Sequence, residues 1–420
     1  MRSSSSLHQQ GERVIDRCRE IAAFTEVPGE ITRTFLSPPM RGVHELVREW
    51  MESAGMSVRI DAVGNIRGLY PCLKPDGPRL LIGSHLDTVP NAGAFDGVLG
   101  VVLGIAVVEQ LHGRRLPFAI EVIGLSEEEG IRFSKPFISS FALAGKLDAE
   151  LLAHVDANGI SISDAIKSFG FRIEDLPGAG LAPETFAYLE VHIEQGPVLD
   201  SESLSLAVVD AIVAQSRFEL TFTGQANHAG TTPMHLRHDA LGAASEWVVA
   251  VEEYAKSHAG LVATVGRVTV VPGAGNVVAG QVTASLDVRH SDEGICGAGV
   301  SELLQAASSA AERRGVRVVS RPLLEQASVP MDSRLTSLLH GAAERAGHPA
   351  RRMCSGAGHD AMILAPHVPS AMLFLRSPGG LSHHPDETVL PEDVDAALST
   401  AMEFLCLLRD DRSILKDDHA

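Results

Sequence analysis

Several short segments of this sequence are continuously apolar and end abruptly in histidines or acids. The clearest is Arg79–His85, in which four apolar or glycine residues lead directly into Ser84 and His85. The same pattern recurs in three further segments: Ala119–Leu125, 186–193 and Ser370–Leu375. Strands without polar alternation are typical of a parallel sheet covered on both faces. Helix-like stretches separate them, so we expect an α/β domain with a mixed, mostly parallel sheet flanked by helices.

The middle of the chain has a different pattern. Residues 218–223 alternate strictly between apolar and polar, and so do residues 281–289. Period-two alternation predicts antiparallel strands with one face in water. Two helical stretches and two further strand-like runs accompany these segments. We therefore expect an inserted α+β domain of about four antiparallel strands and two helices at 213–329, which divides the α/β domain into 1–212 and 330–420.

Composition excludes several classes of protein. The chain has 35 Lys and Arg against 53 Asp and Glu, a formal net charge of −18, whereas nucleic-acid binders need a basic face. The longest apolar run, 98–108, is far shorter than the ~20 residues of a membrane span. The five cysteines form no CxxC pair, which disfavours thiolate metal sites and disulfide frameworks. We expect a cytoplasmic protein, with neither nucleic acid nor membrane as a partner.

Potential metal ligands follow each of the buried strands. The carboxyl ends of parallel strands meet at one edge of an α/β sheet, which is where such sheets bind ligands. A lone histidine at a strand end is usually capped or solvated, and a run of glutamates is usually a solvated loop. Convergence on one edge favours a common site for His85, Asp87, Asp96, Glu127, Glu128, Glu129, His192, His383 and His384. With no cysteine among them, the site suits Zn²⁺, Mn²⁺, Co²⁺ or Ni²⁺.

The same residues carry a family resemblance that spans nearly the whole chain. The motifs, in chain order, are Gly83-Ser84-His85-Leu86-Asp87, Asp96-Gly97, Glu128-Glu129-Gly130-Ile131-Arg132-Phe133, His192-Ile193-Glu194-Gln195-Gly196-Pro197, Ser355-Gly356-Ala357-Gly358-His359-Asp360 and Leu381-Ser382-His383. Together they resemble the amidase/hydantoinase/carbamoylase family of the dinuclear metallopeptidase superfamily. The resemblance implies that the inserted domain is a lid and dimerisation domain.

The resemblance also implies two divalent metal ions per subunit, Mn²⁺ or Zn²⁺, with Co²⁺ or Ni²⁺ as further possibilities. One ion would be held by His85 and His192 and the other by Glu129 and His383, with Asp96 bridging the two. In the same comparison Glu128 would be the general base and Asp87 would orient His85. Neither Glu127 nor His384 receives a role.

Substrate contacts are likewise implied by the resemblance. His228 lies in a lid motif and would stabilise the oxyanion in the active site of a partner subunit, which predicts a homodimer. Asn276 and Arg289 match residues that bind the substrate carboxylate, for which the planar guanidinium is well suited. Gln195 would contact the ureido group, and Gly358 would lie in a loop on the substrate side.

The family chemistry is hydrolysis of a ureido or carbamoyl C–N bond next to a carboxylate. Residues 32–38 resemble the allantoate branch, which would convert allantoate to ureidoglycine, ammonia and carbon dioxide. An N-carbamoyl-L-amino-acid hydrolase or β-ureidopropionase is the alternative, and a dipeptidase or aminoacylase is less favoured. A non-catalytic, metal-holding binding protein is also disfavoured, because Glu128 and all five ligand candidates are present.

Overall fold

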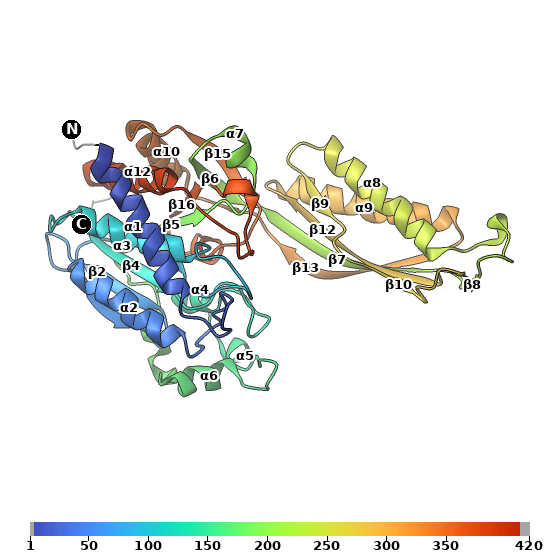
Figure 1. Cartoon of the computed structure of the whole chain (residues 1–420), viewed down its shortest axis with the longest axis horizontal. Coiled ribbons are helices and arrows are strands. Elements are labelled where there is room, and N and C mark those ends of the chain that lie inside the picture. Colours follow the sequence, from blue (N-terminus) through green and yellow to red (C-terminus); the bar gives the residue numbers. More distant parts are fainter. Residues whose placement is uncertain (1–3, 412–420) are drawn as a thin grey trace. The chain divides into compact units, whose positions relative to one another are not determined.

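A computed structural model describes residues 4–411 of the chain. These residues divide into two compact units (Figure 1). The first unit comprises the residues up to Asp210 together with those from Pro330 onward, and the second comprises Ala211–Val329. None of the helices in the described range combines the length and apolarity that a membrane crossing requires.

The first unit is built on a nine-stranded sheet. Its strands run in the order β1 (Ser57–Ile60), β2 (Ile66–Tyr70), β4 (Ala119–Leu125), β3 (Arg79–His85), β5 (Thr185–Ile193), β16 (Ser370–Leu375), β6 (Leu206–Ile212) and β14 (Val329–Pro330), with β15 (Ala350–Ser355) also paired to β6. The centre is parallel, since β3 pairs in parallel with β4 and β5, and β5 with β16. The outer pairs β2–β4 and β6–β16 are antiparallel, so the sheet is mixed, as expected.

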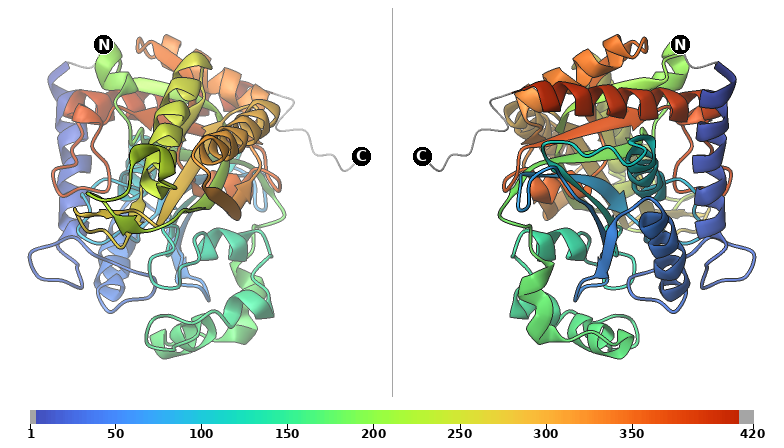
Figure 2. Two further views of the ribbon diagram at one scale, coloured as in Figure 1. Left: turned by 90° about the vertical axis from the view of Figure 1, so that its right-hand side faces the viewer. Right: turned by 90° about the vertical axis from the view of Figure 1, so that its left-hand side faces the viewer.

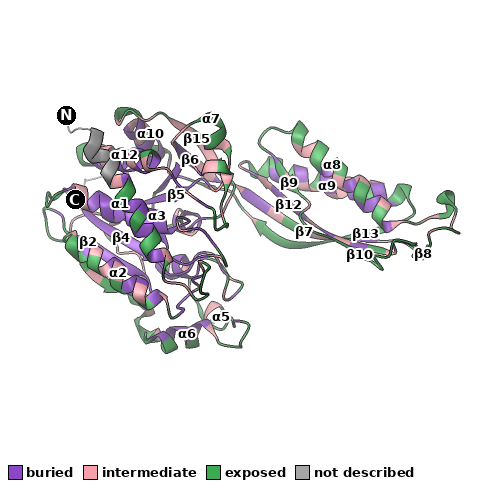
Figure 3. Ribbon diagram, viewed as in Figure 1, coloured by how far each residue is buried: buried purple, intermediate pink, exposed green. Residues whose placement is uncertain are grey.

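Helices flank this sheet (Figure 2). They are α1 (Ser4–Ala22), α2 (Met40–Ser53), α3 (Val98–Gln110), α4 (Ile138–Leu143), α5 (Ala149–Leu152), α6 (Ile162–Phe169), α7 (Val198–Glu202), α10 (Ser333–Arg345), α11 (Asp360–Leu364) and α12 (Pro391–Asp410), with short 3₁₀ turns η1 (Ile173–Ala179) and η3 (Pro378–Gly380). The long apolar run forms most of α3, which packs against β3, β4 and β5 and is buried from Val98 to Val108 (Figure 3). The helix is thus internal because neighbouring elements cover every side of it.

The second unit contains a five-stranded antiparallel sheet with two helices packed against it (Figure 1). The sheet order is β10 (Val268–Val271), β12 (Gln281–His290), β7 (Ala214–Thr223) and β13 (Arg317–Gln326), with β9 (Val262–Thr264) also paired to β12. The helices are α8 (Ala240–Ser257) and α9 (Glu293–Arg313), and η2 (Met234–Leu236) is a short 3₁₀ turn. A separate two-stranded ribbon pairs β8 (Asn227–His228) with β11 (Val277–Val278).

Alternation along the strands explains the core of the second unit. The side chains of Phe218, Leu220 and Phe222 are buried, and Phe222 lies against the indole of Trp247 from α8. The sheet has five strands where about four were expected, because residues 262–271 form two strands, β9 and β10. Asp292 caps α9, because its carboxylate accepts a hydrogen bond from the Ile295 N–H.

Candidate metal centre and active site

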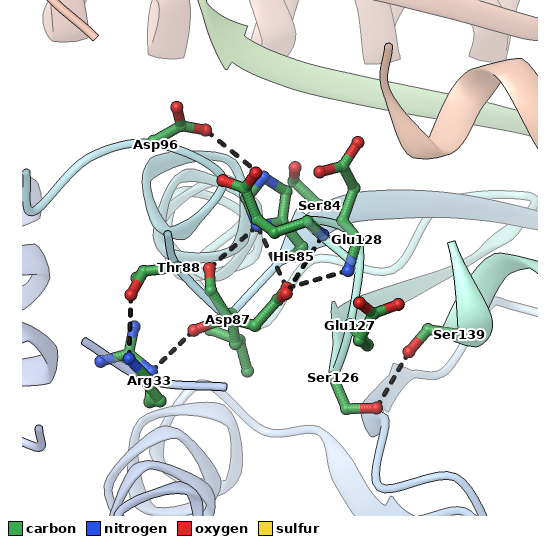
Figure 4. Close-up of polar contacts among 12 residues, drawn as sticks. Arg33, Ser84, His85, Asp87, Thr88, Asp96, Ser126, Glu127, Glu128 and Ser139 are labelled. Atoms are coloured by element: carbon green, nitrogen blue, oxygen red, sulfur yellow. Dashed lines mark hydrogen bonds and ion pairs between the residues drawn. The ribbon is translucent and has the colours of Figure 1, made fainter. Parts of the chain in front are cut away.

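The carboxyl ends of three strands, β3, β4 and β5, bring the predicted ligands to one edge of the sheet in the first unit. His85 is the last residue of β3 and lies in register with Leu125 at the end of β4, two residues before Glu127. Phe374 near the end of β16 is in register with His192 of β5. Figure 4 shows His85, Asp87 and Asp96 close to Glu128 at this edge. Parallel pairing therefore produces the convergence that the sequence predicts.

The first group of potential metal ligands consists of His85, Asp96 and His192, all buried. The Oδ1 atom of Asp96 lies 3.4 Å from Nε2 of His85 and 3.1 Å from Nε2 of His192. The two Nε2 atoms are themselves 3.4 Å apart. All three atoms lie within the spacing of one coordination sphere.

The second group shares Asp96 and adds Glu129 and His383. Nε2 of His383 lies 3.4 Å from the other carboxylate oxygen of Asp96, Oδ2, and 3.5 Å from Oε1 of Glu129. Asp96 thus presents one oxygen to each group. A carboxylate between two groups of imidazole and carboxylate ligands is an arrangement suited to two divalent ions.

The geometry of Asp96 tests whether these residues fit a cation. Its Oδ1 atom is buried and receives no hydrogen bond from the described residues. His85 and His192 each direct Nδ1 to a main-chain carbonyl, of Asp87 at 3.1 Å and of Ile193 at 2.9 Å. With Nδ1 protonated for these bonds, both Nε2 atoms present lone pairs toward the same oxygen. A divalent cation satisfies all three lone pairs, so the residues fit a metal.

The electrostatics of the site also favour positive charge. Burial by itself lowers the pKa of His85, but the neighbouring carboxylates of Asp87 and Asp96 favour the protonated ring and hold the pKa well above its ordinary value. Burial raises the pKa of Glu128 well above its usual range, while His85 opposes this shift. Burial likewise raises the pKa of Glu129 to about 7, and the nearby Asp96 carboxylate adds to the effect. These acids are therefore held in water-poor surroundings that a cation would compensate.

Asp87 contacts more of the site than the sequence suggested. Its Oδ1 lies 3.4 Å from Nδ1 of His85, which has a nearer acceptor in the Asp87 main-chain carbonyl. One carboxylate oxygen instead accepts a hydrogen bond from the main-chain N–H of Glu128 at 3.0 Å (Figure 4). The other accepts one from the main-chain N–H of Glu129 at 3.1 Å. Asp87 thereby fixes the turn that carries both glutamates as well as the neighbouring histidine.

Gln195 and Ser382 both contact Asp96. The Gln195 side-chain amide donates a hydrogen bond to Asp96 Oδ2 at 2.8 Å, and the Ser382 hydroxyl donates one to the same oxygen at 2.9 Å. Gln195 adopts a left-handed φ of 58°, which is costly for a residue with a side chain. The amide that sequence comparison assigned to a ureido group is therefore also a partner of a potential metal ligand.

Gly358 lies in the loop between β15 and α11, one residue before a buried histidine. The ring of that residue, His359, packs edge-on against His192 with the ring centroids 4.5 Å apart. Nε2 of His359 is 2.8 Å from the Ser355 hydroxyl. Gly358 itself is exposed, and a Cβ there would lie 2.9 Å from the Phe137 ring. The loop therefore borders the site, and glycine leaves space beside Phe137.

His228 and Asn276 lie together in the second unit. The β8–β11 ribbon pairs His228 with Val277, and the Ala229 N–H donates to the Asn276 carbonyl at 2.9 Å. Nδ1 of His228 accepts hydrogen bonds from the N–H groups of Gly230 and Thr231, at 3.0 and 3.2 Å. A ring that accepts at Nδ1 carries its proton on Nε2. The exposed His228 ring is thus held as an Nε2–H donor.

Arg289 lies at the other end of the same unit. Its guanidinium donates two hydrogen bonds to Asp287, at 2.7 and 3.0 Å. Gln281, where β12 begins just after the ribbon, precedes Arg289 by eight residues, about 27 Å of extended strand. The connections to the ribbon also leave the sheet at the Gln281 end, since the Gly224 N–H bonds the Gly280 carbonyl. Within one second unit, the structure does not bring Arg289 together with His228 and Asn276.

Two acids near the site were not assigned a role from sequence. Glu127 is buried and accepts hydrogen bonds from the N–H groups of Gly130 at 2.6 Å and Ile138 at 2.9 Å, which closes the loop after Glu129. Glu387 accepts hydrogen bonds from the main chain at Asp96. Neither contact leaves a local pattern in the sequence, because both acids act on main-chain groups. His384 is exposed and lies 3.8 Å from the Asp386 carboxylate.

Comparisons with known proteins agree with this geometry. The sequence profile of Peptidase family M20/M25/M40 matches residues 81–407. "Allantoate deiminase 1" of Glycine max is 36% identical over 94% of this chain and 89% of its own length. "N-carbamoyl-L-amino acid amidohydrolase" of Geobacillus stearothermophilus is 38% identical over 91% of this chain and 95% of its own.

A solved structure extends the similarity to the fold. The hydantoinase/carbamoylase family amidase of Burkholderia ambifaria superimposes with a TM-score of 0.89, at 34% identity, over 96% of this chain and 98% of that one. The relatives and the fold agree over nearly the whole chain, and the sequence profile covers residues 81–407. The chain therefore belongs to Peptidase family M20/M25/M40 and, within it, to the hydantoinase/carbamoylase family of amidases.

Proposed function

We propose that this protein is a dinuclear metal-dependent amidohydrolase that cleaves a ureido or carbamoyl C–N bond next to a carboxylate. The observation that carries the proposal is the pair of ligand groups that share Asp96, with Glu128 beside them. The names of the relatives from Glycine max and Geobacillus stearothermophilus support the same chemistry. Two divalent cations held here would polarise a carbonyl group and lower the pKa of a water molecule.

In this proposal, His85 and His192 would hold one cation, Glu129 and His383 would hold the other, and Asp96 would serve both. Mn²⁺ or Zn²⁺ suits this set of imidazoles and carboxylates, and Co²⁺ or Ni²⁺ would also be accepted. The ligand distances within each group support this assignment.

Glu128 is proposed as the general base. It removes a proton from the attacking water as the water oxygen bonds to the ureido carbon. The C–N bond then breaks, and Glu128 returns the proton to the leaving nitrogen, which departs as ammonia. The carbamate left on the other nitrogen then loses carbon dioxide and becomes the amine of the product. Glu128 also lies with His85 and Glu129 in a third group of potential ligands, so its carboxylate is close to the proposed cations. The two groups that contain Asp96 supply ligands without it, and we therefore propose that Glu128 transfers protons.

His228 is proposed to stabilise the oxyanion from the partner subunit. Its Nε2–H donor, fixed by the two N–H groups bonded to Nδ1, is a suitable preorganised group. Asn276 and Arg289 would bind the substrate carboxylate, and Gln195 and Gly358 would border the ureido group. The long separation along β12 supports a site shared between two subunits, because one second unit cannot place His228 and Arg289 on one small substrate. We accordingly propose a cytoplasmic homodimer formed through the second unit.

Allantoate is the proposed substrate, with ureidoglycine, ammonia and carbon dioxide as the products. The segment that resembles the allantoate branch packs directly on the metal site: Arg33 donates from Nε to the Leu86 carbonyl at 2.7 Å, and the Thr88 N–H donates to the Arg33 carbonyl at 2.8 Å. Arg33 is fully buried, so the segment acts by supporting the loop that contains Asp87 rather than by touching substrate.

An N-carbamoyl-L-amino-acid hydrolase is the second candidate, favoured by the relative from Geobacillus stearothermophilus. The test follows ammonia release by the Mn²⁺-loaded enzyme from allantoate, ureidoglycolate, several N-carbamoyl-L-amino acids and N-carbamoyl-β-alanine, and release of free amino acids from dipeptides. Allantoate should give the highest kcat/KM. Turnover of N-carbamoyl amino acids without turnover of allantoate would reverse the order of the two candidates. Cleavage of dipeptides alone would refute both.

A further inference from the structure

We propose that Glu387 is a positioning residue that fixes the main chain of Asp96 and so places both oxygens of that carboxylate for metal binding. The inference rests on the metal centre proposed above. It concerns a residue 291 positions from Asp96 in the sequence, joined to it by a direct contact.

The contact is made by one oxygen of the Glu387 carboxylate. Oε1 accepts hydrogen bonds from the main-chain N–H groups of Phe95 and Asp96, both at 3.0 Å. The side chain is buried, with 5% of the residue exposed. Oε2 is also buried and has no hydrogen-bond partner among the described residues. The carboxylate is therefore used through a single oxygen that holds two consecutive peptide groups.

The main chain around Asp96 needs such a partner. Residues 86–97 form neither helix nor strand, so their N–H groups are not satisfied by regular hydrogen bonding. Gly97 then adopts a left-handed φ of 67° before α3 begins. The two bonds to Glu387 set the peptide orientation at Asp96, and the direction of its side chain follows from that orientation.

Gly93 provides the space for this contact. A Cβ at position 93 would lie 2.3 Å from Cβ and 2.5 Å from Oε1 of Glu387. No side chain fits there unless Glu387 moves. The close approach shows that the chain before Asp96 packs directly on the Glu387 side chain.

The same loop also holds the Asp96 carboxylate. Ser382 donates from its hydroxyl to Asp96 Oδ2, and the following residue, His383, lies 3.4 Å from that oxygen. One short segment, 382–387, thus contacts Asp96 at its side chain through Ser382 and at its main chain through Glu387. Because Asp96 belongs to both ligand groups, displacement of its main chain would weaken both metal positions.

Three substitutions at Glu387 distinguish the effect of side-chain length from the effect of its negative charge. Glu387→Gln keeps the length and one acceptor oxygen but removes the charge. Glu387→Asp keeps the charge but is one methylene too short, and Glu387→Ala removes the acceptor. Asp386→Ala is the matched control, because this acid lies in the same loop with 80% of its side chain exposed. Gly93→Ala disturbs the contact from the opposite side.

The readout is metal binding by the metal-free, full-length protein, with Zn²⁺ followed by calorimetry and Co²⁺ by its visible absorption. The wild type and Asp386→Ala should bind two ions per subunit. Glu387→Asp, Glu387→Ala and Gly93→Ala should bind ~10–100-fold more weakly, the usual effect of losing a residue that orients metal ligands. Glu387→Gln should bind metal with an affinity close to that of the wild type. It would not do so if Glu387 acted through its negative charge, because this substitution removes the charge.

Each outcome decides between the alternatives. Wild-type affinity in Glu387→Asp and Glu387→Ala would overturn the proposal. Weak binding by Glu387→Gln with normal binding by Glu387→Asp would also overturn it, since charge would then matter and reach would not. If Glu387→Ala fails to fold, the Gln and Asp variants still give the answer, with unfolding temperatures measured alongside. A wild type that binds no metal would instead refute the metal centre itself.

Discussion

The carboxylate of Asp87 joins two strand ends. The carboxylate accepts hydrogen bonds from the N–H groups of Glu128 and Glu129, which follow β4. The main-chain carbonyl of Asp87 accepts a hydrogen bond from the His85 ring at the end of β3. Glu128 and Glu129 lie in a bend after β4, and their hydrogen bonds to Asp87 hold both peptide groups. Glu129 faces His383, and Glu128 lies with Glu129 and His85 in a group of potential metal ligands. In the proposed mechanism, this contact would hold the two adjacent glutamates for different tasks.

Glu128→Gln tests that division of tasks. The substitution preserves size but removes the proton acceptor, so kcat should fall by ~10²–10⁴ while KM changes little. Metal content measured by elemental analysis should stay at two ions per subunit, because Glu129 and Asp96 are unaltered. Glu150→Gln, the same change at an exposed glutamate, is the control. Activity retained by Glu128→Gln would show that another group is the base.

His44 in α2 should make stability depend on pH. Burial lowers the pKa of His44 from 6.5 to about 4, while a hydrogen bond with the Gly64 main chain partly opposes burial and Arg48 and Arg41 add to it. The unfolded chain therefore binds a proton between pH 6.5 and 4 that the folded chain does not. Stability is complete above pH 6.5 and falls as pH decreases toward 4, by on the order of 3 kcal/mol from this residue.

Urea unfolding of the wild type and His44→Leu at several pH values measures this contribution. The variant should lose less stability than the wild type between pH 7 and pH 4, whatever its stability at neutral pH. The same substitution at the exposed His154 serves as the control. Parallel curves for the wild type and His44→Leu would show that His44 is protonated in the folded state.

At the scale of elements, the sequence predicted the central strands well. The bounds of β3, β4 and β16 match the apolar runs residue for residue, because strands buried on both faces carry their own signal. The edge strand β15 was not foreseen, since its polar sequence gains stability from pairing with β6 across more than a hundred residues. Helix α12 was also left unassigned, although Pro391 in its first turn is a helix-start signal.

Some residues of the candidate site could be predicted from the sequence and others could not. Ligands at strand ends were predictable because topology brings strand ends together. Glu387 was not predictable, because it lies in a loop and acts on peptide N–H groups 291 and 292 positions away. Contacts to the main chain place no demand on the residue type of the partner, so they leave no paired motif in a single sequence.

The junction between the metal site and α3 leads to a prediction about Gly97. A Cβ at Gly97 would lie 2.4 Å from the His85 imidazole, and its φ is 67°. Gly97→Ala should therefore displace His85 and weaken metal binding, in addition to the ~1–3 kcal/mol cost of backbone strain. Gly113→Ala is matched, because Gly113 has a φ of 80° with no atom within 4 Å of a Cβ. Calorimetric metal titration should show weaker binding only for Gly97→Ala; equal affinities would exclude the contact with His85.

For the whole molecule, the length of β12 bears on assembly. A small substrate cannot span the about 27 Å between the start of β12 and Arg289, so a site that uses both ends of the second unit needs two copies. A symmetric dimer supplies each site with one end from each subunit. In the proposed homodimer, assembly would thereby be required for catalysis.

Mixed dimers test this directly. Subunits carrying Glu128→Gln and subunits carrying His228→Ala, co-expressed with different affinity tags and purified through both, should regain about half of the wild-type activity, since one of two sites is intact. Pairing Glu128→Gln with His85→Ala should regain nothing, because both residues belong to the same cluster. A fully active monomer, or no recovery in the first pairing, would contradict the shared site.

The strand order of the first unit has a consequence for how the protein is made. β16, at residues 370–375, lies between β5 and β6, which are both finished by residue 212. On the ribosome, the second unit emerges complete while the sheet of the first still lacks an interior strand. β5 and β6 are synthesised early and cannot form the final sheet until β16 is inserted between them. His383 is synthesised after β16. A nascent chain therefore completes the proposed metal site only after β16 and His383 have been made, and premature termination anywhere before β16 leaves no working fragment.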